Sequence, residues 1–224
     1  MLPKWNNQSG TPLLYLITDR QQFKTSATPA QLSAQLEAIT HAAAAGCQLI
    51  QVREKDLSSR ELCAFVRAAL AAIRPFGAKL LVNDRLDVAL ATGADGIHLR
   101  VNSLPVAEVR QLVPPDFLVG ASTHSLAEAQ AAAAGGADFL VCGPVFFTPS
   151  KASYGPPLGL ERFGEICQRV KLPVLALGGI TMNNFADCLA QRAAGVAAIS
   201  LFNHPATLGT NIKMMLSSRC LPTR

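Results

Sequence analysis

The sequence predicts an α/β protein with one domain, a (β/α)8 or TIM barrel that covers residues 1–224. An Ala-rich helical segment, a glycine and a short apolar run recur along the chain, as in "AAAAGCQLIQVRE" and "AAAAGGADFLVCGPV". The apolar runs show little alternation, which is typical of strands buried on both faces of a parallel sheet. Eight such runs alternate with helical stretches, and eight parallel strands with their helices close into a barrel.

The expected elements follow one another in order along the chain. The strands are residues 13–18, 49–53, 79–83, 96–99, 117–121, 139–143, 174–177 and 197–200. Alanine favours helix and glycine ends it, which predicts helices over residues 31–45, 59–72, 104–112 and 126–134. An open doubly wound sheet fits less well, because "DRQQFK" rather than a GxGxxG loop follows the first strand. We expect the ends, residues 1–10 and 216–224, to be loose.

Composition excludes several classes of function. The 224 residues are 50% hydrophobic and 16% charged, enough to bury one sizeable core. The chain has no run of 18 apolar residues, and its start, "MLPKWNNQSGTP", is polar, so we expect no membrane partner and no export. A net charge of +5 without a Lys/Arg run argues against nucleic acid. Six cysteines without a CxxC pair indicate free thiols in a reducing cytoplasm.

The carboxyl ends of the strands are the expected active site, because TIM barrels build their sites there. Each end is polar or glycine, and cationic side chains outnumber carboxylates. Gln51, Arg53 and Lys55 are spaced by two and therefore share one face of a strand end. Arginine offers a fork for phosphate oxygens and lysine a point charge, so the three would converge on one anion. The alternative is structural: Glu54 and Asp56 could simply form salt bridges with neighbouring helices.

"VNDR" places Asn83 and Asp84 at the third strand end. The pair could cap the next helix, or Asp84 could hold Mg2+, which takes one or two carboxylates together with phosphate oxygens. "GASTHS" offers Ser122 to a ligand. His124 is a possible acid or base, or a wall residue, and Ser125 with Glu128 predicts a capping box.

The sixth strand end adds to the cationic pocket of strands two to six, and the last two strand ends predict a second anion pocket. "FFTPSKASYGPPLG" is a long loop that offers Thr148, Ser150 and Lys151. The loops after strands seven and eight of such barrels often bind phosphate through backbone amides, here near Gly179, Ile199 and Ser200. A cationic pocket suits a diphosphate and an amide pocket suits a phosphate. Together they indicate a transferase with pyrophosphate as the leaving group.

These segments resemble thiamine phosphate synthase and its relatives, the TenI-like thiazole tautomerases. The likeness covers residues 13–202 and runs in order through "LYLITDR", "QVREKDLS", "LLVNDRLDVALATGADGIHL", "GASTHS", "GPVFFTPSK", "LGLE", "LALGGI" and "GVAAIS". In that family the synthase joins a pyrimidine methyl diphosphate to a thiazole phosphate and releases pyrophosphate.

The resemblance implies roles for single residues. The pyrimidine diphosphate would be bound by Gln51, Arg53, Lys55, Asn83, Ser122 and Lys151, of which Arg53, Lys55, Ser122 and Lys151 would be catalytic. Asp84 would bind Mg2+, Thr148 and Ser150 would meet the thiazole, and Gly179, Ile199 and Ser200 would hold its phosphate.

The chain departs from the synthase pattern after "GADGIHL". Ser103 stands at the position of a second acidic metal ligand, and Arg100 lies nearby. Either Arg100 takes over part of the pyrophosphate charge, or synthase activity is weak or absent. The alternative functions are a TenI-type tautomerase that uses His124, and a non-catalytic regulator that binds thiazole phosphate. We also expect a homodimer, since barrels of this size often pair.

Overall fold

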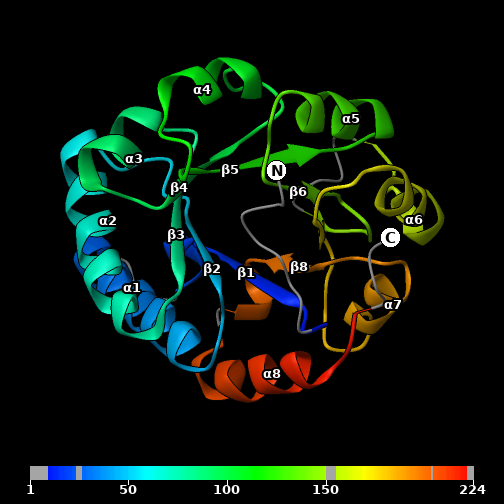
Figure 1. Ribbon diagram of the computed structural model, residues 1–224. Coiled ribbons are helices and arrows are strands. Elements are labelled where there is room, and N and C mark those ends of the chain that lie inside the picture. The colour runs from blue at the N-terminus through cyan, green and yellow to red at the C-terminus, as the bar shows by residue number, and fades with distance from the viewer. Residues whose placement is uncertain (1–9, 24–26, 150–154, 203, 221–224) are drawn as a thin grey trace.

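In the computed structural model, eight parallel strands close into a barrel in the order β1 to β8, and the helices form a ring around it (Figure 1). The structure describes residues 10–23, 27–149, 155–202 and 204–220. The expected (β/α)8 barrel is therefore confirmed. In the described part of the chain, none of the helices has the length and apolar character needed to cross a lipid bilayer.

The strands lie close to the expected positions. They are β1 Leu13–Ile17, β2 Leu49–Val52, β3 Lys79–Asn83, β4 Gly96–Leu99, β5 Leu118–Thr123, β6 Phe139–Cys142, β7 Val174–Leu177 and β8 Gly195–Ala198. β5 runs further than expected and takes in Ser122. β8 begins two residues before the expected strand, where a Cβ on Gly195 would lie 1.9 Å from the carbonyl oxygen of Leu13. Glycine is needed there because β1 and β8 approach so closely.

The helices follow the strands in alternation. They are α1 Thr28–Ala44, α2 Ser59–Ile73, α3 Leu86–Thr92, α4 Val106–Leu112, α5 Leu126–Ala134, α6 Gly159–Arg169, α7 Phe185–Ala190 and α8 Pro205–Ser217, with short 3-10 turns η1 Arg20–Gln22, η2 Arg74–Phe76 and η4 Ser200–Phe202. The expected loose carboxyl end is wrong for residues 216 and 217, which belong to α8. Just beyond α8, the Cys220 amide donates to the Gly10 carbonyl at 2.9 Å.

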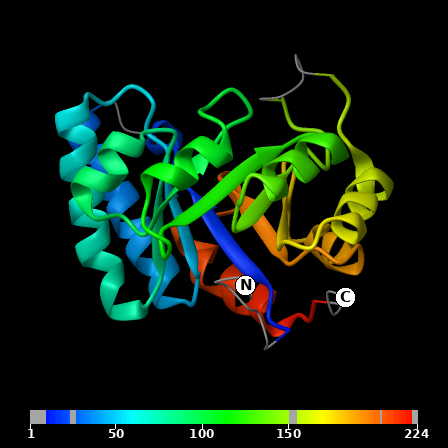
Figure 2. The same ribbon diagram turned by 45° about the horizontal axis from the view of Figure 1, so that its top comes forward.

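Alternate side chains of the strands serve two cores. Toward the barrel interior, one cluster is formed by Leu13, Tyr15, Ile17, Leu49, Leu81, Leu118, Phe139, Val141, Leu175, Ala194 and Ala197. The other strand face packs against the helices, as Ile50 and Val52 do with Val66 and Leu70 of α2. Figure 2 shows the strands crossing the middle of the molecule between the helices of the first and second halves. This double burial explains the apolar runs in the sequence.

Candidate active site

The end of β2 carries Gln51, Arg53 and Lys55 outward from the barrel interior. Gln51 is 1% exposed, and its Nε2 donates to the Tyr15 hydroxyl at 3.0 Å. Arg53 is half-buried and its backbone N–H donates to Thr18 Oγ1 at 2.9 Å, while Lys55 is exposed in the loop that follows. Exposure to solvent thus increases from the buried Gln51 amide through Arg53 to the exposed Lys55.

The Arg53 guanidinium lies among charges from its own strand end and from two others. Burial lowers the pKa of Arg53, the carboxylates of Asp19 and Glu54 raise it, and the Arg100 charge lowers it. The Arg53 charge also contributes to a lowered pKa of His98, for which burial is the larger cause. Arg53 is therefore a partly desolvated cation at the barrel mouth, where electrostatic interactions are stronger than in water.

Glu54 and Asp56 form salt bridges, as the structural alternative expected. Their partner, Arg20, lies on the 3-10 turn η1 rather than on one of the α-helices. Arg20 Nη1 donates to Glu54 Oε2 at 2.9 Å, and Arg20 Nη2 donates to Asp56 Oδ2 at 2.7 Å. The side chains of Arg20 and Glu54 are 4% and 2% exposed. We call Arg20, Glu54 and Asp56 the β1–β2 cluster. It ties the loops after two neighbouring strands together.

A second arginine–carboxylate group joins the ends of β3 and β4. Asp84 Oδ2 accepts from Arg100 Nε at 3.1 Å and also from Arg100 Nη2, and Asp84 Oδ1 accepts from the Ser103 hydroxyl. The Arg100 backbone N–H donates to Ser103 Oγ at 2.8 Å, which closes the turn. We call Asp84, Arg100 and Ser103 the β3–β4 cluster. The side chains of Arg100 and Asp84 are 43% and 26% exposed, so this cluster is open to solvent.

The backbone at Asp84 is held in an uncommon conformation. Its φ is +63°, in the left-handed region that a non-glycine residue seldom adopts, and its N–H donates to the His98 carbonyl at 3.0 Å. The N-cap of α3 is Arg85 and no side chain caps it, so the alternative in which Asn83 and Asp84 cap this helix does not hold. The conformation instead directs the Asp84 carboxylate toward Arg100 and Ser103.

The β3–β4 cluster does not fit the expected Mg2+ site. Mg2+ prefers one or two carboxylates with free coordination positions and keeps several waters. Both oxygens of Asp84 already accept hydrogen bonds, one from a guanidinium and one from a hydroxyl. Burial raises the pKa of Asp84, but hydrogen bonds from Ser103 and Arg100 bring it below its ordinary value.

Ser122 is oriented by a histidine from the neighbouring strand. His98 Nε2 lies 2.9 Å from Ser122 Oγ, and His98 is 2% exposed. Its Nδ1 is buried and has no hydrogen-bond partner among the described residues. A buried N–H without an acceptor is costly, so the proton belongs on Nε2, which then donates to Ser122. The Ser122 hydroxyl proton is thereby left for a ligand.

The turn after β5 places His124 at the surface. His124 is exposed, and its Nδ1 lies 3.3 Å from Glu128 Oε2. Ser125 is the N-cap of α5 and accepts from the Glu128 N–H, as the sequence predicts. The reciprocal bond differs, because the Glu128 carboxylate accepts from the His124 N–H at 2.7 Å. His124 therefore has a local partner that fixes it to the helix start.

The ends of β7 and β8 carry the residues expected to bind a phosphate, and the loop after β6 passes beside the end of β7. Thr148 is partly buried, whereas Ser150 and Lys151 lie outside the described residues. Gly179 has φ +66°, and a Cβ there would lie 2.6 Å from the Phe147 carbonyl oxygen. Only glycine allows the chain after β7 to pass the β6–α6 loop at this distance. Asn184, a residue without a role in the sequence reasoning, fixes this turn by donating from Nδ2 to the Gly179 carbonyl at 2.9 Å.

Beyond β8, Ile199 is partly buried, and Ser200 is exposed at the first position of η4. Since β7 pairs with β8, these two residues follow a strand adjacent to the one that leads to Gly179. The barrel thus places the three expected phosphate-binding residues at neighbouring strand ends.

Two buried residues, Tyr15 and His98, were given no ligand by the sequence, although His98 was counted among the strand ends of the site. Both lie in the barrel interior, with ring centroids 5.7 Å apart. Alternation in "GIHL" could have placed His98 inward, but its contact with Ser122 depends on the register between β4 and β5.

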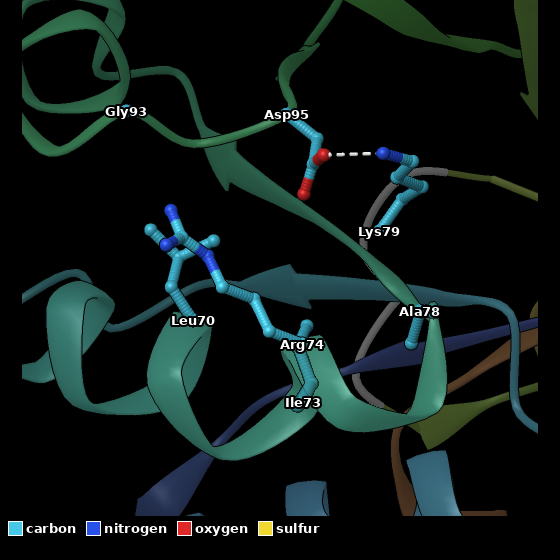
Figure 3. Close-up of a pocket in the computed structure, with 8 residues that line it drawn as sticks. Leu70, Ile73, Arg74, Ala78, Lys79, Gly93 and Asp95 are labelled. Carbon is cyan, nitrogen blue, oxygen red and sulfur yellow. Dashed lines mark hydrogen bonds and ion pairs between the residues drawn. The ribbon is translucent and has the colours of Figure 1, made fainter.

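A pocket of about 190 Å³ lies at the opposite end of the barrel (Figure 3). Its lining includes Lys79, which begins β3, and Asp95, which precedes β4. Lys79 Nζ donates to Asp95 Oδ1 at 2.7 Å, as the dashed line in Figure 3 marks. This pocket is at the amino ends of the strands and shares no residue with the candidate site.

Comparisons with known proteins identify the family of the chain. A family model described as thiamine monophosphate synthase matches residues 14–202. A putative thiamine-phosphate synthase of Geobacter sulfurreducens is 47% identical over 187 residues, which cover 84% of each chain. The thiamine-phosphate synthase of Methanoculleus marisnigri is 51% identical over 159 residues, 71% of this chain and 75% of that one. Among solved structures, thiamine phosphate pyrophosphorylase from Pyrococcus furiosus is 32% identical with a TM-score of 0.76, and the match covers 92% of this chain and 97% of that one.

Proposed function

The chain belongs to the thiamine monophosphate synthase family, and on that premise we propose that its strand ends bind a pyrimidine methyl diphosphate and a thiazole phosphate and join them to thiamine phosphate. The expected family and enzyme class, a transferase, are confirmed by the relatives. The observation that carries the assignment of the site is that the partly desolvated Arg53 acts electrostatically on His98, the residue that orients the Ser122 hydroxyl.

The reaction needs charge stabilisation rather than a protein nucleophile. The C–O bond between the pyrimidine methylene and the diphosphate breaks, and its electron pair leaves with pyrophosphate. The lone pair of the thiazole nitrogen then forms the new C–N bond, which gives the thiazolium cation of thiamine phosphate. Cations fixed near the departing pyrophosphate stabilise the charge that develops on it.

Each site residue has a defined part in this proposal. Arg53 and Lys55 bind the diphosphate, and Ser122 donates its hydroxyl proton to it. Gln51 and Asn83 line the pyrimidine side of the pocket. Thr148 meets the thiazole, and the backbone near Gly179, Ile199 and Ser200 binds its phosphate. Lys151 and Ser150 keep the roles that the resemblance implies. The homodimer and the cytoplasmic location remain predictions. The expected Mg2+ cofactor is also untested, and the contacts of Asp84 argue against a site on that carboxylate.

The direct test is product formation. Purified protein is mixed with both substrates, and thiamine phosphate and pyrophosphate are measured by mass spectrometry. The proposal predicts both products in equal amounts. If the folded protein forms no thiamine phosphate in any buffer, with or without Mg2+, the synthase assignment fails.

The same samples separate the alternative functions. A tautomerase would exchange a proton of the thiazole phosphate with deuterated solvent when the diphosphate is absent. A regulator would bind thiazole phosphate, as measured by thermal stabilisation, without altering either substrate.

A further inference from the structure

We propose that the Arg100 guanidinium is the resident cation of the β3–β4 cluster, so that the protein binds diphosphate through Arg100 without a divalent ion on Asp84. This inference rests on the proposed function for the identity of the diphosphate. It goes beyond that function because it assigns the positive charge beside Asp84 to the Arg100 side chain. No metal ion is then needed at this position.

The first argument is the occupation of Asp84. Both of its oxygens accept hydrogen bonds, from Arg100 and from Ser103. A divalent ion on Asp84 would have to displace the guanidinium or share the carboxylate with it. A divalent ion and the Arg100 guanidinium on one carboxylate would repel each other. A second carboxylate could offset this repulsion, but position 103 is serine.

The second argument is the way in which Arg100 is held. Nε and Nη2 both face Asp84 Oδ2, which fixes the plane of the guanidinium. Nη1 makes no hydrogen bond within the described residues, and the side chain is 43% exposed. A guanidinium that is anchored on one edge and open on the other is preorganised to bind a phosphate oxygen.

The third argument is the position of Arg100 relative to Arg53. The charge of Arg100 lowers the pKa of Arg53, so the two guanidinium groups share one region at the barrel mouth. Asp84 pairs with Arg100, whereas Asp19 and Glu54 offset part of the Arg53 charge through Coulomb attraction. An anion with several charged oxygens, such as a diphosphate, can bridge the two arginines and relieve their repulsion.

The test uses inorganic pyrophosphate as the probe and metal-stripped protein in EDTA. Isothermal titration is expected to give binding in EDTA, and Mg2+ should change the affinity for free pyrophosphate by less than about threefold. Arg100→Gln should weaken binding in EDTA by tenfold or more, and Arg100→Lys should lose less because it keeps the charge. The matched control is Arg85→Gln. Arg85 follows Asp84 in the sequence but pairs with Asp87, so its substitution should leave pyrophosphate binding unchanged.

A second measurement follows the metal itself by electron paramagnetic resonance of Mn2+. The wild type should show no tight Mn2+ site. The double variant Arg100→Gly with Ser103→Asp restores two carboxylates and should gain one. Thermal melting of each variant verifies the fold. Since Arg100 is nearly half exposed, its loss should cost little stability.

Two results would overturn the inference: pyrophosphate binding by the wild type only when Mg2+ is present, or equal binding by wild type and Arg100→Gln in EDTA. Either can occur while the synthase reaction proceeds, so the inference can fail when the proposed function holds. Conversely, the protein could bind pyrophosphate in EDTA and yet form no thiamine phosphate. That result would contradict the proposed function and leave the role of Arg100 intact.

Discussion

Two arginine–carboxylate clusters occupy the same end of the barrel and differ in burial. In the β1–β2 cluster, the side chains of Arg20 and Glu54 are 4% and 2% exposed, whereas Arg100 and Asp84 of the β3–β4 cluster are 43% and 26% exposed. The buried arginine uses both terminal nitrogens on carboxylates, and the open one uses a single edge. The same residue types therefore connect loops in one place and present a cation to ligands in the other.

The largest expected effect concerns the buried cluster. Arg20→Met leaves the Glu54 carboxylate buried without its partner, and breaking a buried pair in this way costs about 3 to 5 kcal/mol of unfolding free energy. Urea denaturation followed by circular dichroism measures it. Arg85→Met is the control, because its exposed pair with Asp87 should be worth less than about 1 kcal/mol. Equal losses of unfolding free energy in the two variants would mean that the burial of the β1–β2 cluster does not make it more important for stability than an exposed pair.

Arg53 lies between the two clusters and should show the largest effect on activity. A hydrogen bond to a charged group contributes about 1.5 to 3 kcal/mol, so Arg53→Gln should lower kcat/KM by roughly 10- to 100-fold. Steady-state kinetics of thiamine phosphate formation provides the measurement. Arg74→Gln, which lies at the opposite end of the barrel, serves as the control. An unchanged kcat/KM for Arg53→Gln would place the diphosphate elsewhere.

His98 links the open cluster to the interior, and its burial predicts a dependence of stability on pH. Burial lowers the pKa of His98 to about 3, whereas an unfolded histidine titrates near 6.5. Between these two pKa values, His98 is protonated in the unfolded chain and neutral in the folded chain. The contribution of His98 to stability is complete above pH 6.5 and is lost as the pH falls toward 3.

Between pH 7 and pH 5, the wild type should lose about 2 kcal/mol more unfolding free energy than His98→Gln, which cannot titrate. Urea denaturation at the two pH values tests this expectation. The same slope in both proteins would mean that His98 takes up a proton as readily in the folded as in the unfolded chain, and the uncharged state assigned to the buried His98 would then be wrong.

The smallest effect is expected at His124. Its exposed ring lies beside Glu128 and outside both clusters, so His124→Gln should change kcat for thiamine phosphate by less than about twofold. A loss of a hundredfold or more would make His124 an acid or base of the reaction and would favour the tautomerase alternative.

The sequence predicted which end of the barrel holds the site, because parallel strands of a closed barrel bring all their carboxyl ends together. It also placed Gln51, Arg53 and Lys55 at this end, although β2 ends at Val52 and their convergence on one anion stays a prediction. The N-cap at Ser125 is equally local and was confirmed.

What the sequence did not settle depends on pairings between distant segments. Arg20 and Arg100 each follow a strand, and nothing local indicates that one will be buried against Glu54, 34 residues away. The orientation of Asp84 depends on a left-handed φ and on the Ser103 turn, neither of which follows from helix-capping preferences. The contact of His98 with Ser122 requires the register of two strands.

The most direct test of the account is a crystal structure of the protein with pyrophosphate, grown with Mg2+ present. The account predicts pyrophosphate oxygens within hydrogen-bond distance of both Arg53 and Arg100, while Asp84 stays paired with Arg100 and carries no metal. A Mg2+ ion bound to Asp84, with Arg100 displaced from the carboxylate, would contradict it.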